Sequence, residues 1–217
     1  MSETNLNSNL TFVCDEKFQT IIDNIDVELN TMMDGWCEKN EEKCSGGNMR
    51  CIRGENIENL VKKTVKYIQD TYGMNVYAVK GSDDKKQLSV NYNDRIIKKE
   101  HQVDMHIYKD DKFIAAIECK AYLDSCFYVR ACDDFRLFKK YGYDIKTFVF
   151  TLEHSIDENS KLFIDIDNDF VCDEIFCMLD GKRSSSKPIY DKKYKKQVNK
   201  EKLAYFVTSL LQLFDIY

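Results

Sequence analysis

The chain has 217 residues, which is enough for one domain with a buried core, and its composition is 32% charged and 43% hydrophobic residues. Its net charge of −5 excludes a uniformly basic nucleic-acid coat protein, so any polyanionic partner must be bound by a local basic patch. The sequence contains no apolar run of about 18 residues and no signal-peptide pattern. Several of its nine cysteines lie in apolar patterns, which suits reduced, buried thiols. We therefore expect a cytoplasmic protein with no membrane partner.

An amphipathic helix is predicted from Asp15 onward, because apolar residues recur there at helical spacing. They are Phe18, Ile21, Ile22, Ile25, Leu29 and Met32. Residues 34–53 hold three glycines and read as an irregular segment. This segment contains Trp36, the only tryptophan, which could stack on a base or, more commonly, fill a gap in the core.

A second helix is predicted from Gly54 to Tyr72, with Gly73 as its C-terminal stop. Glu58 lies at the edge of its apolar face, near the helix N-terminus. Such a carboxylate is either a surface charge favoured by the helix dipole or an acid that points into a site. The pattern leaves both readings open.

A strand is predicted at residues 75–79, followed by a polar excursion over residues 80–99 that is either a hairpin or a mobile loop. Two further strands then occupy residues 102–121, joined by the polar turn at 109–112. Because alternate residues of a strand point to opposite faces, the pleat divides this second hairpin into two sets of side chains. The set predicted to face the core is Val103, Met105, Ile107, Phe113, Ala115, Ile117 and Cys119, and the opposite set is Asp104, His106, Tyr108, Ala116, Glu118 and Lys120.

Asp104, Glu118 and Lys120 are therefore expected on one side of the hairpin. Two neighbouring carboxylates can hold a hard divalent cation through oxygen, and a nearby lysine can orient a water molecule or a phosphate oxygen. The alternative is that these charges are only the solvated face of a hairpin. The pattern alone does not decide between the two.

After the hairpin, a helix is predicted over residues 124–141 and a strand over residues 146–153. A strand, helix and strand of this length predict a right-handed crossover between parallel strands. A further helix is predicted at residues 170–179, and a last one at residues 200–214 that packs on the core or forms a dimer surface.

The segment from Gly181 to Lys202 is the most basic part of the chain, with nine Lys or Arg residues against two acids. It is either a solvated loop or a segment that contacts phosphates, because hydroxyl side chains are interleaved with its cations. The residues proposed to bind DNA are Lys182, Arg183, Lys187, Lys192, Lys193, Lys195 and Lys196.

This order of elements, with Asp104 followed by Glu118-Cys119-Lys120, resembles the PD-(D/E)xK nuclease family over residues 54–153. Glu58 fits the place of an acid that the family often adds from the preceding helix, whereas Val103 stands where the family motif has proline. The resemblance implies an α/β (α+β) restriction-endonuclease-like core, with a mixed central sheet flanked by helices. We expect a single nuclease domain over residues 1–217, with helical additions at 1–53 and 154–217.

The resemblance also implies a mechanism. Asp104 and Glu118, with the backbone carbonyl of Cys119, would bind Mg²⁺, for which Mn²⁺ would substitute. Lys120 would hold the attacking water and stabilise developing negative charge, and Glu58 would hold a second metal or an outer water. His106, on the same face as Asp104, could contact a phosphate, although a structural role is the commoner one for such a residue.

Within this family, the additions around the core favour a type II restriction endonuclease. Such an enzyme would cut double-stranded DNA at a specific sequence, leave 5′-phosphates and act as a homodimer. The alternatives are a structure-specific repair or recombination nuclease and a non-catalytic DNA-binding protein of the same fold.

Overall fold

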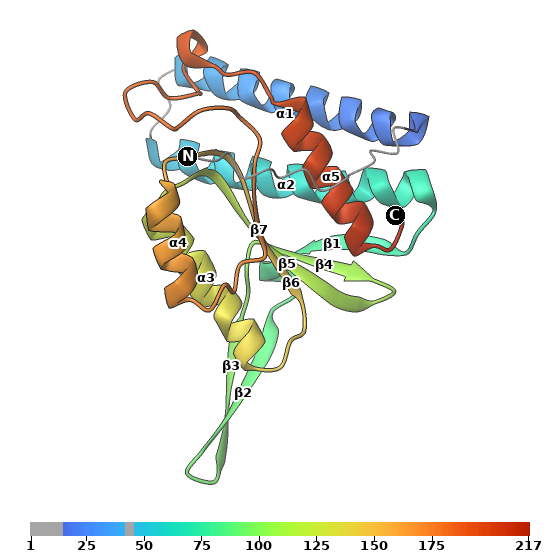
Figure 1. The fold of residues 1–217 in the computed structure, drawn as a ribbon, viewed down its shortest axis with the longest axis vertical. Coiled ribbons are helices and arrows are strands. Elements are labelled where there is room, and N and C mark those ends of the chain that lie inside the picture. Colours follow the sequence, from blue (N-terminus) through green and yellow to red (C-terminus); the bar gives the residue numbers. More distant parts are fainter. Residues whose placement is uncertain (1–14, 42–45) are drawn as a thin grey trace, which may run out of the picture.

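The computed structural model describes residues 15–41 and 46–217. Two long helices precede the strands, and a final helix follows them (Figure 1). The elements, in chain order, are α1 (Glu16–Glu41), α2 (Gly46–Tyr72), β1 (Val76–Lys80), a 3-10 turn (Gly81–Asp83), β2 (Lys86–Tyr92), β3 (Arg95–His101), β4 (Met105–Lys109), β5 (Lys112–Leu123), α3 (Ser125–Lys140), β6 (Lys146–His154), α4 (Glu158–Asp167), β7 (Glu174–Cys177), a 3-10 turn (Lys192–Tyr194) and α5 (Lys200–Leu213).

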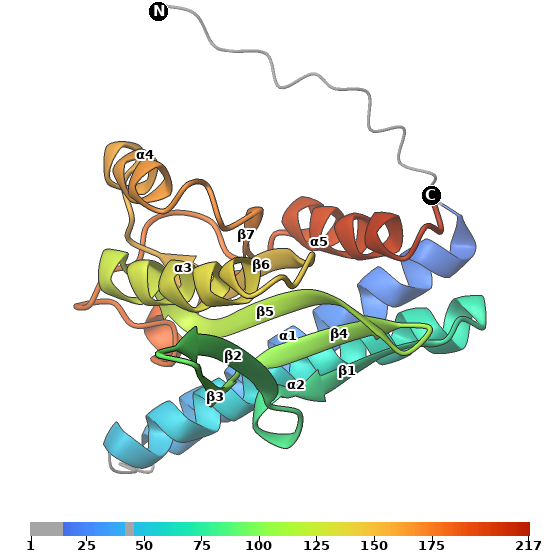
Figure 2. The same ribbon diagram turned by 90° about the horizontal axis from the view of Figure 1, so that it is seen from below.

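The central sheet is mixed and has the strand order β1-β4-β5-β6-β7. The β1–β4 and β4–β5 pairs are antiparallel, whereas β5–β6 and β6–β7 are parallel. The predicted crossover between parallel strands is therefore confirmed, with α3 connecting β5 to β6. Figure 2 shows α3 and the α1–α2 pair on opposite sides of the sheet, so helices flank it as predicted.

Each face of the sheet packs against its own group of helices. One hydrophobic core joins α1, α2 and α5 to one face, and a second core joins α3 and α4 to the other. Trp36 is only 1% exposed in the first core, and its Nε1 donates to Asn56 Oδ1 at 2.9 Å. It thus fills the core rather than a base-stacking position. The last helix, α5, is likewise a core helix, because its buried face belongs to the same cluster.

The prediction of an irregular segment at 34–53 is wrong. Helix α1 continues to Glu41 because Met33, Trp36 and Cys37 extend its buried stripe by one more turn. Helix α2 begins at Gly46, eight residues before its predicted start, while residues 42–45 lie outside the described part. Glycines in helix interiors cost stability, but tertiary packing overrides that preference here.

The prediction of a helix at 170–179 is also wrong. The helix of this region, α4, ends at Asp167, and Asp169 and Phe170 both have a φ of 51°, in the left-handed region that interrupts a helix. The chain then forms β7, which pairs with β6 in parallel. No helix among residues 15–41 and 46–217 has the length and apolar character needed to cross a membrane.

The β4–β5 hairpin has the predicted faces except at two residues. Ile107 pairs with Ala115 but Tyr108 pairs with Phe113, so Ile114 is an extra residue and the pleat shifts by one. Phe113 consequently packs with the α3–α4 core, as does Val103, which precedes β4. Both residues were expected on the opposite face.

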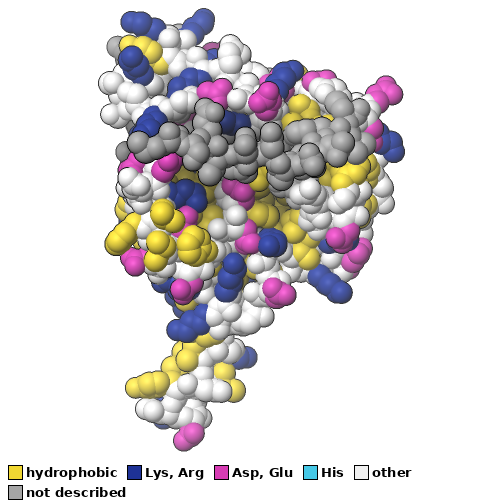
Figure 3. Space-filling model, viewed as in Figure 1, with side chains coloured by type: hydrophobic (Ala, Val, Ile, Leu, Met, Phe, Trp, Pro, Cys, Tyr) yellow, Lys and Arg dark blue, Asp and Glu magenta, His cyan; other side chains and the backbone are white. Residues whose placement is uncertain are grey.

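The polar excursion forms the β2–β3 hairpin, which pairs with no strand of the central sheet. We call its residues, Lys86 to His101, the arm. Figure 3 shows the arm standing clear of the body of the molecule, with hydrophobic and basic side chains along it. Its turn is formed by Asn93 and Asp94, both at positive φ (48° and 57°), as a tight hairpin turn requires.

Candidate active site

Asp104 lies in the bend between β3 and β4, where its side chain reaches across to β5. Its Oδ2 accepts hydrogen bonds from the backbone N–H of Cys119 at 2.8 Å and from Lys120 Nζ at 2.7 Å. The bend is held by a hydrogen bond from Gly81 N–H to the carbonyl of Asp104 at 3.0 Å. A Cβ on residue 81 would lie 1.8 Å from the carbonyl oxygen of Val103, so only glycine allows this close approach.

Glu118 and Lys120 are two residues apart on β5 and therefore share a face of the sheet. Lys120 Nζ donates to Glu118 Oε2 at 2.5 Å as well as to Asp104. One ammonium group is thus shared by two carboxylates. The structure brings together Asp104, Glu118 and Lys120, which we call the Asp104–Glu118–Lys120 cluster.

The electrostatics of the cluster are set first by the burial of Glu118 and second by the nearby carboxylate of Asp104. Burial and the charge of Asp104 outweigh the attraction of Lys120 and raise the pKa of Glu118 to about 7. Burial alone would lower the pKa of Lys120, but Glu118 and Asp104 raise it above its ordinary value. Lys120 therefore stays protonated at neutral pH.

The Cys119 side chain points away from the cluster into the α1–α2–α5 core. Burial first, and then the charge of Asp104, hold the pKa of its thiol well above its ordinary value, so it is not a thiolate nucleophile at neutral pH. Only its backbone lies beside the two carboxylates, through the bond from its N–H to Asp104.

Glu58 lies on α2 and is not part of the cluster. Its carboxylate pairs with Lys80 Nζ at 3.2 Å, and Glu55 is 3.7 Å from the same nitrogen. Within residues 15–41 and 46–217, no three His, Cys, Asp or Glu side chains are grouped closely enough to hold a metal ion. Glu58 nevertheless lies within electrostatic range of the Cys119 thiol, whose pKa it raises together with Asp104 and Glu118.

His106 and Tyr108 share the face of Asp104 but belong to a different group at the base of the arm. His106 Nδ1 lies 3.1 Å from Asp84 Oδ2, and the Tyr108 hydroxyl donates to the same oxygen. His106 is fully buried, and burial lowers its pKa despite the nearby carboxylate. His106 is therefore not accessible to a phosphate in this structure, and its partner is the Asp84 carboxylate.

Asp134 is a neighbour of the site that the sequence reasoning missed. It lies on α3, and burial raises the pKa of its carboxyl group against the opposing charges of His101 and Lys120. The charge of Asp104 also contributes to this shift, and Asp134 Oδ1 lies 3.9 Å from His101 Nε2. The sequence signal was weak, because a charged residue next to the buried Phe135 reads as the rim of an amphipathic helix.

The basic segment is only partly free to bind DNA. Lys195 Nζ pairs with Asp34 at 2.6 Å and Lys196 Nζ with the buried Glu153 at 2.5 Å, while the Arg183 guanidinium stacks 3.6 Å above the Tyr122 ring. The remaining predicted residues are exposed, namely Lys182, Lys187, Lys192 and Lys193. Tyr122 lies on β5 two residues after Lys120, so the stacked Arg183 brings this segment close to the strand that carries the cluster.

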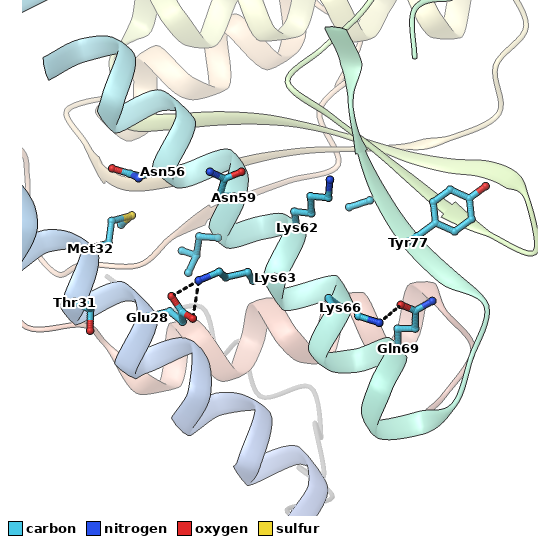
Figure 4. Close-up of a pocket in the computed structure, with 12 residues that line it drawn as sticks. Glu28, Thr31, Met32, Asn56, Asn59, Lys62, Lys63, Lys66, Gln69 and Tyr77 are labelled. Carbon is cyan, nitrogen blue, oxygen red and sulfur yellow. Dashed lines mark hydrogen bonds and ion pairs between the residues drawn. The ribbon is translucent and has the colours of Figure 1, made fainter. Parts of the chain in front are cut away.

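A groove between α1, α2 and β1 has a volume of about 520 Å³ and holds several lysines (Figure 4). Its cations are already neutralised in part, since Lys63 pairs with Glu28 at 2.7 Å and Lys66 with Asp70 at 2.7 Å. None of the three residues of the Asp104–Glu118–Lys120 cluster lines it. The cluster, rather than this groove, is the candidate active site.

No protein-family model and no curated protein sequence matches the chain. Among solved structures, the chain is similar to the native BbvCI A2B2 tetramer, with 10% sequence identity and a TM-score of 0.37. The similarity covers 94% of this chain and 98% of that chain. Because a TM-score below 0.5 does not establish a common fold, the functional case depends on the site itself.

Proposed function

We propose that the chain is a metal-dependent endonuclease that cuts double-stranded DNA at a specific sequence, as a type II restriction enzyme does. The observation that carries the proposal is one ammonium group, on Lys120, held between the carboxylates of Asp104 and Glu118 at 2.7 and 2.5 Å. The roles proposed for these three side chains are those that the resemblance to the PD-(D/E)xK motif implies. The domain, residues 1–217, would act as a homodimer so that each copy cuts one strand.

The two carboxylates of the cluster are too few to enclose a metal ion, but they fit a hard divalent cation such as Mg²⁺ or Mn²⁺ that takes its other ligands from water and from phosphate oxygens. Carboxylate oxygens are the ligands such ions take, and two carboxylates share a single ammonium group here, so the cluster has an excess of negative charge when both acids are ionised. Asp104, Glu118 and the backbone carbonyl of Cys119 would hold the ion, with Glu58 as the ligand of a second ion or of a water molecule. When bound, the ion would polarise the scissile phosphate and lower the pKa of a water molecule.

The chain's own groups then have separate tasks. Lys120 stays protonated, so it acts as a cation and hydrogen-bond donor rather than as a base, and it would stabilise charge that develops on the phosphate. Asp104 is fixed by the Cys119 N–H, which orients it before substrate binds. Water would attack phosphorus as the bond to the 3′ oxygen breaks, and this oxygen would leave as a hydroxyl group after taking up a proton, so that the products carry a 5′-phosphate and a 3′-hydroxyl.

Incubation of the protein with a plasmid and a phage genome tests the proposal, with Mg²⁺, Mn²⁺ or EDTA in parallel. Lys120→Gln removes the shared ammonium, and Lys63→Gln is the matched control because Lys63 makes a similar 2.7 Å ion pair on the surface. Discrete fragments that need the metal and vanish only in Lys120→Gln are the expected result. Cleavage of branched substrates alone would point to a repair nuclease, and metal-independent binding without cleavage would point to a DNA-binding protein.

A further inference from the structure

The arm is a projection whose base is built into the body of the protein. At its base, Leu88 is 2% exposed and His101 is 6% exposed, whereas every residue from 89 to 100 is exposed. An isolated two-stranded hairpin is only marginally stable in water, so these buried residues are what hold the arm in place.

Polar contacts at the base fix the direction in which the arm points. Asp84 Oδ2 accepts a hydrogen bond from Lys86 Nζ at 2.8 Å and one from the Tyr108 hydroxyl, and it lies 3.1 Å from His106 Nδ1. Tyr108 and His106 belong to β4, the strand that Asp104 precedes. The arm is thus tied to the same strand that positions the catalytic aspartate of the proposed function.

The two faces of the arm have different chemistry. Strand pairing sets Ser89 opposite Lys98 and Asn91 opposite Ile96 on one face. The other face has Val90 opposite Ile97 and Tyr92 opposite Arg95. The first face offers a hydroxyl, an amide, an ammonium and an aliphatic group, which are the kinds of side chain that contact base edges and thymine methyl groups.

The charge and the width of the arm both match duplex DNA. Lys98, Lys99 and Arg95 are exposed cations, and of the two acids Glu100 is paired with Lys85 at 3.0 Å. Strands about 4.8 Å apart, with their side chains, fill a major groove about 12 Å wide but exceed a minor groove about 6 Å wide. A symmetric contact with a second copy would instead bring like charges together.

We propose that the arm enters the major groove beside the cut and that its Ser89–Asn91–Ile96–Lys98 face reads the bases there. This inference rests on the proposed nuclease function and names the recognition element of that same site. Because β3 leads through two residues into Asp104, the arm projects from the segment that carries the aspartate of the proposed site. Lys98 would contact either a base or the backbone, and the exposed residues of the opposite face would fill the groove.

The first variant shortens the arm by replacing residues 90–97 with Asn-Gly, which joins the paired residues Ser89 and Lys98 by a two-residue turn. It removes one acid and one cation, Asp94 and Arg95, so the net charge is unchanged. The second is the double variant Ser89→Ala with Asn91→Ala, and Tyr92→Phe on the opposite face is its control.

Each protein is tested for cleavage of a phage genome, for binding of a mixed-sequence duplex by fluorescence anisotropy, and for sedimentation. Protection of guanine N7 from dimethyl sulfate is measured in the Lys120→Gln background, so that the duplex stays intact. This reagent reports on the major groove, because guanine N7 lies there.

The expected result is that the shortened arm keeps binding to mixed-sequence DNA but loses both the discrete cleavage pattern and the guanine N7 protection. The double alanine variant should lose discrimination between cut and uncut sequences by about 10-fold or more, whereas Tyr92→Phe should keep it. Unchanged cleavage sites in the shortened protein would overturn the inference. The inference would also be overturned if the full-length chain gave no guanine N7 protection and shortening the arm converted a dimer to a monomer. That result would show that the arm contacts a second copy of the chain.

Failure of the nuclease assignment is distinguishable from failure of the arm inference. If no metal supports cleavage while the arm still determines guanine N7 protection, the nuclease function is wrong and groove reading by the arm is upheld. If the full-length chain neither cuts nor binds duplex DNA, both proposals are overturned.

Discussion

Replacing Glu118 with glutamine should stabilise the protein above neutral pH while it abolishes cleavage. In the folded protein the pKa of Glu118 is raised to about 7 from an ordinary value of 4.5, mainly by burial and by the charge of Asp104. The folded state therefore binds this proton more tightly than the unfolded state does. The associated stability is fully present below pH 4.5 and is lost as the pH rises through about 7.

The size of the effect follows from the two pKa values. Their difference corresponds to about 3 kcal/mol in total, of which about 2.5 kcal/mol is lost between about pH 5 and pH 8. Glutamine does not ionise, so the variant keeps this stability. Lys120 retains Asp104 as its partner at 2.7 Å, and its raised pKa places its own titration outside this pH range.

The measurement is the free energy of unfolding in urea from about pH 5 to pH 8, with the fluorescence of the buried Trp36 as the signal that reports unfolding. The stability difference between Glu118→Gln and wild type should grow by about 2.5 kcal/mol over that range. Glu100→Gln, on the exposed part of the arm, controls for the loss of a surface charge. Parallel curves for Glu118→Gln and wild type would refute the view that burial and the charge of Asp104 raise the pKa of Glu118.

Two further predictions concern the packing around the site. Gly81→Ala should destabilise the protein by about 2 kcal/mol or more and shift Asp104, because the new Cβ would collide with the backbone of Val103, whereas Gly54→Ala in the open interior of α2 should stabilise it by about 0.5–1 kcal/mol. Thermal unfolding of both variants checks this, and equal losses would contradict it. Tyr128→Phe should cost about 1–3 kcal/mol, because it removes the hydroxyl donor of the buried Asp165, and Tyr217→Phe at the exposed C-terminus is its control. Equal urea midpoints for these two variants would show that the Asp165 carboxylate does not need that donor.

The central hairpin could be predicted from sequence because its alternation is regular around Glu118 and Lys120. The register error at Phe113 could not be avoided, because the extra residue at Ile114 depends on how the hairpin meets the aromatic cluster that includes Phe138. The sequence of this hairpin also does not indicate that both of its faces are buried. Side chains such as His106 therefore read as solvated, although Phe138 of α3 and Phe113 of β5 pack against it.

The placement of Glu58 shows a second limit. Its helix and its position on the edge of the apolar face were predictable, but its pairing with Lys80 is a contact between α2 and the end of β1. Such contacts depend on how a helix crosses a sheet, which residue spacing within one element does not specify. The same applies to Asp134, whose relation to Lys120 arises only when α3 packs over β5.

The hydrogen bond from Gly81 N–H to the Asp104 carbonyl, at 3.0 Å, closes the segment between these two residues into a loop with adjoining ends. A loop closed at its root can change in length and sequence at little cost to the fold that carries it. The central sheet and the Asp104–Glu118–Lys120 cluster lie outside this loop, apart from the shared residue at its end. The segment between Gly81 and Asp104 could therefore be replaced by one of different sequence. Proteins that share this fold could then differ in what they bind while they keep the same catalytic residues.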